Sequence, residues 1–462
     1  MNILFVSSSY SNYYAIDDIV RRLYQRGHAV TLILGMEQKE TIPDDAIQHL
    51  QSDIPEIIIE PLKKRRILRN FTRYIREVLN YAHVLNNEDI RKWDVAKWFR
   101  FFPPFLWHII SSPLGRKKLK DAGFQHTLRF VEQKIPVDFA IRKQIQGFAP
   151  DIMVVMPLIN PNSKENEYLR AAQRLGVPVL YSMVSWDNIS SKGTFHGNPD
   201  YSVVWNEPLA LELSHLHGIP HEKIFVTGAP RFDHLLDRGS DRMMSRSEFC
   251  LLAGLNETKD YLLYVGSTFL VTNDYQKNAD ESDLILSIAK GLANDHRTKD
   301  VNLVLRPHPT NSSFLEKLRS CAPPNVFIFP AKGELPDTEE KRNLFHNSIF
   351  HSMAVIGVNT TAFLEASALD KPCITIKTKS SIETQQLPHF RHLAVADFLE
   401  NALSVEDVIR IVTDLKSGGD AHCEQRHEFV RNFLRPKGIS AVDTYVDMIE
   451  ELGGLTQGRA DQ

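Results

Sequence analysis

An arginine and a histidine stand between prolines at the end of an apolar segment, in the sequence Leu-Val-Leu-Arg-Pro-His-Pro at residues 303–309. Each proline fixes its own φ at about −65° and favours an extended backbone in the residue before it. We therefore expect Arg306 and His308 to project from a stiff strand end. A guanidinium beside an imidazole suits a phosphate or diphosphate, because the guanidinium donates two parallel charge-assisted hydrogen bonds. The alternative is a surface strand end with a solvated arginine and a capping histidine.

A second polar segment follows the apolar residues that end at Gly357. Asn359, Thr360 and Thr361 come at the start of a predicted helix, and Glu365 follows about one turn further along. Either threonine could cap this helix, whose unpaired amides attract anions, and Glu365 could contact a ribose hydroxyl. Threonine caps are common without any ligand, so the phosphate prediction depends on the pairing with the arginine and histidine above.

A third strand end in the same half of the chain carries Gly266, Ser267 and Thr268. The glycine permits a close approach of the backbone and the two hydroxyls can donate to a phosphate, although a plain tight turn would use the same residues. Ligands of open α/β sheets bind beyond the carboxyl ends of the strands. The three segments together predict a nucleotide-donor site.

The first half of the chain supplies candidates for a general base. Asp187, Asn188 and Lys192 follow a predicted strand that ends near Met183, and Asp187 could take a proton from an acceptor hydroxyl. His196 is the rival base. Because an aspartate near a turn more often makes a local hydrogen bond to the backbone, the identity of the base stays open.

Motifs that the chain lacks narrow the chemistry. No two aspartates are spaced as D-x-D, the metal-holding pattern of one class of nucleotide-sugar enzymes. Neither a G-x-G-x-x-G fingerprint nor a G-x-x-x-x-G-K-[ST] loop occurs, which disfavours nicotinamide chemistry and P-loop hydrolysis. We expect no metal and no other cofactor, so Arg306, His308 and helix amides would have to offset the charge of the leaving group.

The elements that must position these residues follow an alternation of apolar strands and amphipathic helices, which is typical of parallel sheets. We expect an α/β fold of two doubly wound, Rossmann-like domains that face a cleft. The first domain spans 1–235 with a helical insertion at 61–145, the second spans 248–435, and a helix at 436–455 crosses back to the first. Arg231 lies in the linker, where a cation could contact a diphosphate.

Composition agrees with this class of protein. The chain has 462 residues, too many for a single core, of which 43% are hydrophobic and 24% charged. Four widely separated cysteines lack metal-ligand spacing. Since the sequence shows neither a signal peptide nor 18 consecutive apolar residues, we expect a cytoplasmic protein.

A net charge of −3 conceals a basic segment between Pro61 and Lys120, with fifteen lysines and arginines against four acids. Seven tryptophan and phenylalanine residues fall within 93–107. Basic residues beside exposed aromatics predict peripheral attachment to the anionic inner face of a membrane, or binding of a lipid-linked phosphate or an acidic polysaccharide. A solvated basic face whose aromatics pack inward is the alternative. Nucleic acid is not expected, because no known binding module accompanies the charge.

The chain resembles the GT-B glycosyltransferases in its two α/β halves, the linker Thr227–Asp233, the Arg306-Pro-His-Pro strand end and the Asn359-Thr-Thr…Glu365 helix start. The Arg-Pro-His-Pro element is similar to that of the CDP-glycerol glycerophosphotransferases and the capsule Kdo transferases. Non-hydrolysing UDP-N-acetylglucosamine 2-epimerases have a similar architecture. The architectural resemblance covers most of residues 1–450, but the specific motifs lie mainly in 227–370.

The resemblance implies a nucleotide in the second domain, an acceptor in the first, phosphate contacts from Arg306 and His308, and helix-start donors at Thr360 and Thr361. We predict metal-independent, inverting transfer of a sugar from a nucleotide-activated donor to a glycan or lipid-linked acceptor in cell-surface polysaccharide synthesis. Three alternatives stay open: a glycerol-phosphate transferase, an epimerase that acts on the nucleotide sugar alone, and a non-catalytic protein that binds polysaccharide or membrane. The insertion at 61–145 departs from the GT-B pattern.

Overall fold

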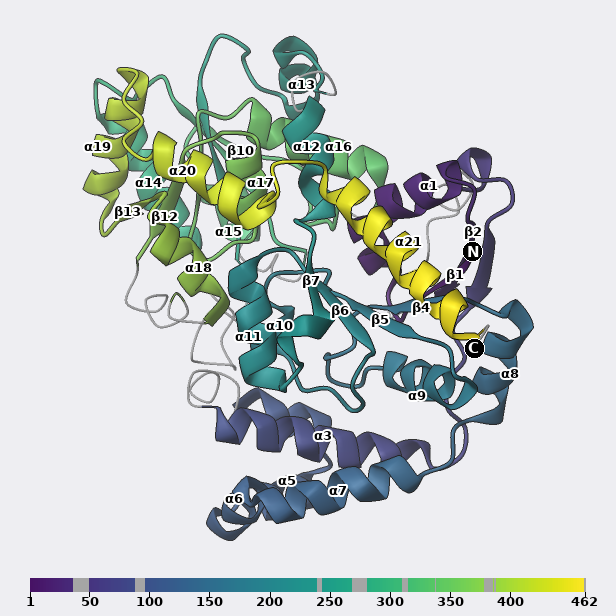
Figure 1. Cartoon of the computed structure of the whole chain (residues 1–462). Coiled ribbons are helices and arrows are strands. Elements are labelled where there is room, and N and C mark those ends of the chain that lie inside the picture. Colours follow the sequence, from purple (N-terminus) through teal and green to yellow (C-terminus); the bar gives the residue numbers. More distant parts are fainter. Residues whose placement is uncertain are drawn as a thin grey trace. The chain divides into compact units, whose positions relative to one another are not determined.

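The computed structural model of the protein describes residues 1–35, 50–87, 96–238, 243–267, 281–309, 315–336, 338–377, 385 and 388–460. The chain forms two compact units, which Figure 1 shows coloured along the sequence. Unit 1 comprises Met1–Asp233 and Phe433–Gln462, and unit 2 comprises His234–Asn432. The chain therefore leaves unit 1 once, forms all of unit 2, and returns.

Unit 1 is built on a seven-stranded sheet with the order β3-β2-β1-β4-β5-β6-β7. Every pair of neighbouring strands in it is parallel. The central strands are short apolar runs that are buried on both faces, which is typical of parallel sheets covered by helices on each side. The strands are β1 (Asn2–Ser7), β2 (Ala29–Leu34), β3 (Ile58–Pro61), β4 (Ile152–Val155), β5 (Val179–Ser182), β6 (Tyr201–Val204) and β7 (Ile224–Val226).

Helices of unit 1 connect these strands and cover the sheet. α1 and the last helix, α21, share one core with Ile3 and Phe5 of β1, whereas α9 contacts β1, β4 and β5. The elements are η1 (Tyr10–Ala15), α1 (Asp17–Gln25), α9 (Glu165–Leu175), α10 (Asn188–Ser191), α11 (Glu207–His217), η3 (His221–Lys223), η4 (Pro230–Phe232) and α21 (Ala441–Ala460).

The returning chain is fixed to unit 1 by polar and apolar contacts. Asp233 accepts hydrogen bonds from Arg435 Nη2 at 2.7 Å, from Ser440 Oγ at 2.9 Å and from the backbone N–H of Val442 at 2.8 Å. Tyr445, Val446 and Ile449 of α21 are buried in the core beneath the sheet. The structure thus places the C-terminal helix in unit 1, as Figure 1 shows for the yellow segment beside α1 and β1.

A helical insertion separates β3 from β4. Its elements are α3 (Arg69–Asn86), η2 (Ala96–Phe101), α5 (Pro104–Ser111), α6 (Pro113–Lys120), α7 (Ala122–Lys134) and α8 (Phe139–Phe148). Trp98 is fully buried in a small core of its own with Tyr81, Phe102 and Leu119. Part of the aromatic segment therefore packs inward, which agrees with the plainer alternative for these residues.

Other apolar side chains of the insertion face solvent. Phe99, Phe105, Ile109 and Leu114 are between 48% and 81% exposed. Lysines of α6 lie in the same part of the chain, and α5 and α6 contact each other. Trp93 lies outside the described residues. Among the described residues, no helix combines the length and the apolar character needed to cross a membrane.

Unit 2 contains a six-stranded parallel sheet with the order β10-β9-β8-β11-β12-β13. Its strands are β8 (Tyr261–Val265), β9 (Asn302–Arg306), β10 (Val326–Ile328), β11 (Ala354–Gly357), β12 (Cys373–Ile376) and β13 (Leu399–Ala402). Its helices are α12 (Asp233–Arg238), α13 (Arg246–Ala253), α14 (Ser282–Asn294), α15 (Leu315–Cys321), α16 (Glu339–Phe350), α17 (Ala362–Ala368), α18 (Pro388–Ala396), α19 (Val405–Lys416), α20 (Cys423–Phe429) and the π-helical η7 (Val430–Leu434).

Candidate functional site

The strand order of unit 2 brings the three predicted donor-binding segments to one edge. β9, β8 and β11 are neighbours in the sheet, and Val265 at the end of β8 lies opposite Arg306 at the end of β9. The segments after these strands carry His308, Gly266 and Ser267, and Asn359 to Thr361. Thr268, which we also predicted to bind the donor, lies outside the described residues. The described part of the chain thus places these segments beyond adjacent carboxyl ends, where α/β sheets bind ligands.

Arg306 is a buried cation at this edge. Its side chain is 5% exposed, and its guanidinium lies 4.5 Å from the ring centroid of Phe345. Burial lowers the pKa of Arg306 to about 10, although the charge of Glu334 opposes this effect, so the group stays cationic at neutral pH. Within the part of the chain that the structure describes, Arg306 forms no ion pair with a carboxylate. Arg306 Nη2 donates a long hydrogen bond of 3.5 Å to Glu334 O, and an anionic ligand would give this buried charge a stronger partner.

Close backbone packing holds the ends of β8 and β9 together. The backbone N–H of Gly266 donates to the carbonyl of Arg306 at 3.0 Å. A Cβ at Gly266 would lie 3.3 Å from both Arg306 O and His308 N, so the glycine permits this approach. The Ser267 N–H donates to Glu281 Oε2 at 3.0 Å. Burial lowers the pKa of the half-buried His308, which favours a neutral imidazole that can donate one hydrogen bond.

The helix start after β11 differs in detail from the prediction. α17 has seven residues and begins at Ala362, whose N–H donates to Thr360 Oγ1 at 3.2 Å, while Thr361 makes no side-chain cap bond. Glu365 is buried in the first turn. Gln385, which sequence reasoning missed, donates to Val358 O at 2.7 Å and so fixes the loop between β11 and α17. No sequence signal marked Gln385, because it lies far along the chain from this loop.

The predicted residues near Asp187 form a local network in unit 1. Asp187 accepts from Ser185 Oγ at 2.6 Å, and Lys192 Nζ lies 3.2 Å from its Oδ2. Asn188 Oδ1 accepts from the backbone N–H of Ser185 at 3.0 Å. This arrangement is the turn-stabilising role that we weighed as the alternative for Asp187. Arg231 lies in η4, with its guanidinium 5.2 Å from the ring of Phe232.

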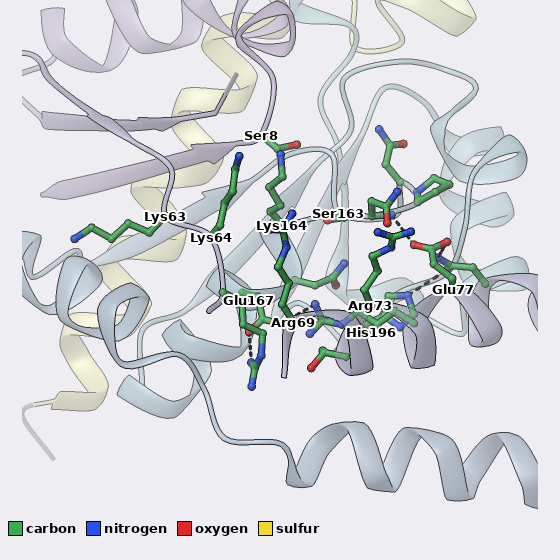
Figure 2. A pocket seen from close by; sticks show the side chains of 18 residues that line it. Ser8, Lys63, Lys64, Arg69, Arg73, Glu77, Ser163, Lys164, Glu167 and His196 are labelled. Atoms are coloured by element: carbon green, nitrogen blue, oxygen red, sulfur yellow. Dashed lines mark hydrogen bonds and ion pairs between the residues drawn. The ribbon is translucent and has the colours of Figure 1, made fainter. Parts of the chain in front are cut away.

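His196 belongs to a different place in unit 1, a polar cavity of about 370 Å³ (Figure 2). Segments that follow the carboxyl ends of β1, β3 and β4 form one wall, and α3 forms another. The α3 side chains in the cavity are spaced at one-turn intervals along a single helix face, namely Arg69, Thr72, Arg73, Arg76, Glu77 and Asn80. Asp187 does not line this cavity.

Two buried carboxylates neutralise two arginines of this cavity. Glu167 pairs with Arg65 Nη1 at 2.6 Å and with Arg76 Nη1 at 2.8 Å, and Glu132 pairs with Arg76 Nε at 2.6 Å. Burial alone would raise the pKa of Glu132, but hydrogen bonds and charges from His196 and Arg76 outweigh it and lower the pKa to about 2. His196 Nε2 lies 3.1 Å from Asn80 Oδ1, and burial lowers the pKa of His196.

Glu77 stands apart from these pairs. It is 1% exposed, its Oε1 accepts from the backbone N–H of Asn162 at 2.6 Å, and Asn80 Nδ2 donates to Oε2 at 3.4 Å. Burial raises the pKa of Glu77 to about 7, although these hydrogen bonds and the charges of Arg73 and Arg76 act in the opposite direction. Sequence reasoning missed Glu77, yet its spacing with the basic residues of α3 is a signal that could have found it.

One group of three potential metal ligands occurs among the described residues, formed by Asp370, Cys423 and His427. Asp370 Oδ1 already accepts from Arg426 Nη2 at 2.6 Å and lies 3.0 Å from His427 Nε2. Because Arg426 neutralises the carboxylate, we interpret this group as an ion-pair network between the turn after α17 and α20.

No protein-family model and no curated protein sequence matches this chain. Solved structures do match it along nearly its whole length. The S. aureus MnaA–UDP co-structure has a TM-score of 0.54 at 12% identity and covers 98% of this chain and 97% of its own. UDP-GlcNAc 2-epimerase from Methanocaldococcus jannaschii has a TM-score of 0.53 at 12% identity, covering 98% and 100%. A variant of the wall teichoic acid polymerase TagF has a TM-score of 0.51 at 11% identity, covering 100% and 90%.

These similarities, at identities of 11–12%, establish the fold. Two parallel-stranded α/β units of this kind define the GT-B class, so the predicted fold class is confirmed. Glycosyltransferases and UDP-GlcNAc 2-epimerases both occur among the similar structures. The predicted resemblance to CDP-glycerol and Kdo transferases in particular stays a prediction.

Proposed function

We propose that this protein is a metal-independent glycosyltransferase that uses a nucleotide-activated sugar, with the donor bound in unit 2 and the acceptor in unit 1. The observation that carries the proposal is the buried, cationic Arg306 at the carboxyl edge of the unit 2 sheet, beside His308. A donor diphosphate would supply the ion-pair partner that this guanidinium lacks among the described residues. The fold supports the proposal, since similar structures include an S. aureus protein with UDP and several glycosyltransferases.

The proposed reaction is a direct displacement. The acceptor hydroxyl oxygen forms the new bond to the anomeric carbon while the bond from that carbon to the diphosphate oxygen breaks, which inverts the centre. The nucleoside diphosphate leaves with the bonding electrons, Arg306 offsets its charge, and the neutral His308 donates a hydrogen bond to it. The hydroxyl proton passes to a base in unit 1, for which Asp187 and His196 are the sequence-based candidates.

The structure supports a third base more strongly. Glu77 lines the unit 1 cavity together with His196, and its pKa of about 7 lies in the range that suits proton transfer near neutral pH. Asp187 is engaged with Ser185 and Lys192 outside the cavity lining. We therefore assign the base role to Glu77.

Nucleotide binding is the first test of this function. We expect UDP, CDP, GDP or CMP to raise the melting temperature of the wild-type protein, and Arg306→Ala to remove most of that shift. Arg410→Ala is the matched control, because the Arg410 side chain is 59% exposed on α19 and, among the described residues, forms ion pairs only with Asp407 and Asp414 of its own helix. Lack of any nucleotide response in the wild type would leave a non-catalytic protein as the better description.

An epimerase is the second candidate, favoured by the likeness to UDP-GlcNAc 2-epimerases. An epimerase acts on the donor alone, whereas a transferase needs an acceptor. Incubating the protein with UDP-GlcNAc and no acceptor separates them, because conversion to a second UDP-sugar would establish epimerase activity. A glycerol-phosphate transferase would instead release CMP from CDP-glycerol.

We propose in addition that the insertion attaches the protein to an anionic membrane, as part of cell-surface polysaccharide synthesis on the inner face. The exposed Phe105 and Leu114 lie close in sequence to Lys117 and Lys118, a combination that suits a lipid interface. Sedimentation with phosphatidylserine vesicles at low salt should carry the wild type down and leave Phe105→Ser with Leu114→Ser in solution. Equal recovery of both proteins in the supernatant would contradict attachment.

A further inference from the structure

The cavity of unit 1 carries more positive charge than its surroundings neutralise. The carboxylates of Glu132 and Glu167 are used by Arg65 and Arg76. Five further cations line the cavity, and within the described part of the chain none of them forms an ion pair with a carboxylate: Lys63, Lys64, Arg69, Arg73 and Lys164. Such an excess around one cavity, even one that is partly open to solvent, raises the local concentration of anions.

The positions of these cations suit a compact, multiply charged group. Figure 2 shows the side chains of Lys64 and Lys164 pointing toward the Ser8 end of the cavity, whereas Lys63 turns away from it. Arg73 extends from α3 beside Ser163 and Glu77 in the same view. Among the described residues, Arg73 Nη2 donates a long hydrogen bond of 3.3 Å to Phe101 O, the guanidinium lies 5.1 Å from the ring of Tyr74, and its buried Nε has no hydrogen-bond partner. A buried N–H without an acceptor is costly, so this atom also points to a ligand.

Phosphate matches this set better than a carboxylate does. Arginine and lysine together give both a directed fork and point charges, and a phosphate ester brings up to two negative charges and three acceptor oxygens. Ser8 and Ser163 also line the cavity wall, where the Ser163 hydroxyl donates to Glu165 Oε2 at 2.8 Å. The cavity volume of about 370 Å³ is sufficient for a phosphate together with an attached small group.

A second cavity adjoins the same lysines. It has a volume of about 390 Å³ and is lined by Lys64 and Lys164 together with mostly apolar residues, among them Leu34, Ile59 and Leu62. A phosphate held by the two lysines could therefore carry either a polar group, in the first cavity, or an alkyl chain, in the second. The shared chemistry is a phosphate ester.

We propose that the unit 1 cavity is an anion site that binds the phosphate ester of the acceptor, through Lys64, Arg73 and Lys164. The cavity can bind a phosphate ester whether or not the donor site binds a nucleotide. That this phosphate ester is the acceptor rests on the proposed function. The acceptor is then a phosphorylated compound whose hydroxyl is held near Glu77 in the same cavity. This assigns the substrate class that the fold alone leaves open.

Calorimetric titration of the full-length protein tests the site with two probes. Glycerol phosphate represents a free phosphate ester, and a long-chain alkyl phosphate in phosphatidylcholine vesicles represents a lipid. We expect at least one probe to bind the wild type, and Lys64→Ala with Lys164→Ala to weaken it about tenfold or more, since each substitution removes a charge-assisted contact. Both lysines lie on loops, and Arg73→Ala is the independent variant on α3.

Arg66→Ala is the matched control. Arg66 carries the same charge in the same segment and is exposed, but it does not line the cavity. This variant should bind the phosphate probes as the wild type does, and the double lysine variant should keep the wild-type response to UDP. Failure of the wild type to bind either phosphate probe, or equal binding by the double variant, would overturn the anion site. If the wild type binds a phosphate probe but does not respond to UDP, that result would count against the donor site and not against the anion site.

Discussion

Replacing Glu77 by glutamine should change how the stability of unit 1 depends on pH. Glu77 is buried, and its pKa rises from the ordinary value of 4.5 to about 7 because of burial. The folded state therefore keeps a proton that the unfolded state releases as the pH rises above 4.5. Since the unfolded state binds fewer protons in this window, the stability of the wild type falls with rising pH until the carboxyl also ionises in the folded state near pH 7.

The size of the effect follows from the shift. Each pKa unit corresponds to about 1.4 kcal/mol, so the wild type should lose roughly 3 kcal/mol between pH 4.5 and 8 that Glu77→Gln does not lose. Below pH 4.5 the two proteins should differ by a constant amount, because glutamate and glutamine are then both neutral. The comparison is between the slopes of stability against pH for the two proteins. Any pH-independent destabilisation by the glutamine therefore cancels.

Tryptophan fluorescence during urea unfolding measures the stability of unit 1 alone at each pH. All five tryptophans of the chain lie between residues 93 and 205, within unit 1. The exposed Glu56, in the same unit, supplies the control variant Glu56→Gln, which should keep the wild-type slope. Parallel pH profiles for the wild type and Glu77→Gln would refute the reasoning and remove the support for Glu77 as a base.

Three further outcomes are expected. Arg306→Lys keeps the charge but loses the planar fork, so the affinity for the nucleotide that stabilises the wild type should fall about tenfold in a calorimetric titration; an unchanged Kd would argue against a bidentate contact. Gly266→Ala places a Cβ 3.3 Å from the backbone of Arg306 and His308, so we expect a lower melting temperature and a smaller nucleotide shift, and a wild-type response would show that the strand ends can move apart without cost. Trp98→Ala empties the insertion core and should cost about 3–5 kcal/mol in urea unfolding followed by the remaining tryptophans, whereas Phe99→Ala, at 48% exposure, should cost less than about 0.5 kcal/mol.

The fold could be predicted from sequence because its signals are local. Short, mostly apolar runs of three to six residues alternate with helices, and this alternation is typical of parallel sheets. The position of the three segments at strand ends could be predicted for the same reason, since residues after a strand necessarily lie at its carboxyl end; their role in donor binding stays a prediction. That prediction needed no knowledge of the strand order, which then placed Arg306 beside Val265.

The unit 1 cavity depended on contacts that no local pattern reveals. Glu167 lies about ninety residues from Arg76 in sequence, and only the folded chain shows that these charges cancel while those of Arg73 and Lys164 do not. The basic segment was identified from composition. Composition could not show which of its cations form buried ion pairs and which have no carboxylate partner. Asp187 was singled out by its neighbourhood to a strand end, and its short bond to Ser185 is the local alternative that such aspartates usually adopt.

The tie between Asp233 and the returning chain bears on how the protein is made. Residues on both sides of unit 2 meet at this carboxylate, so unit 1 lacks part of its core until α21 has emerged from the ribosome. Unit 2 is continuous in sequence and can fold earlier during synthesis. A nascent chain that stops before Tyr445 would expose the apolar surface of α1 and β1 that this helix covers, which makes it a target for chaperones and proteases.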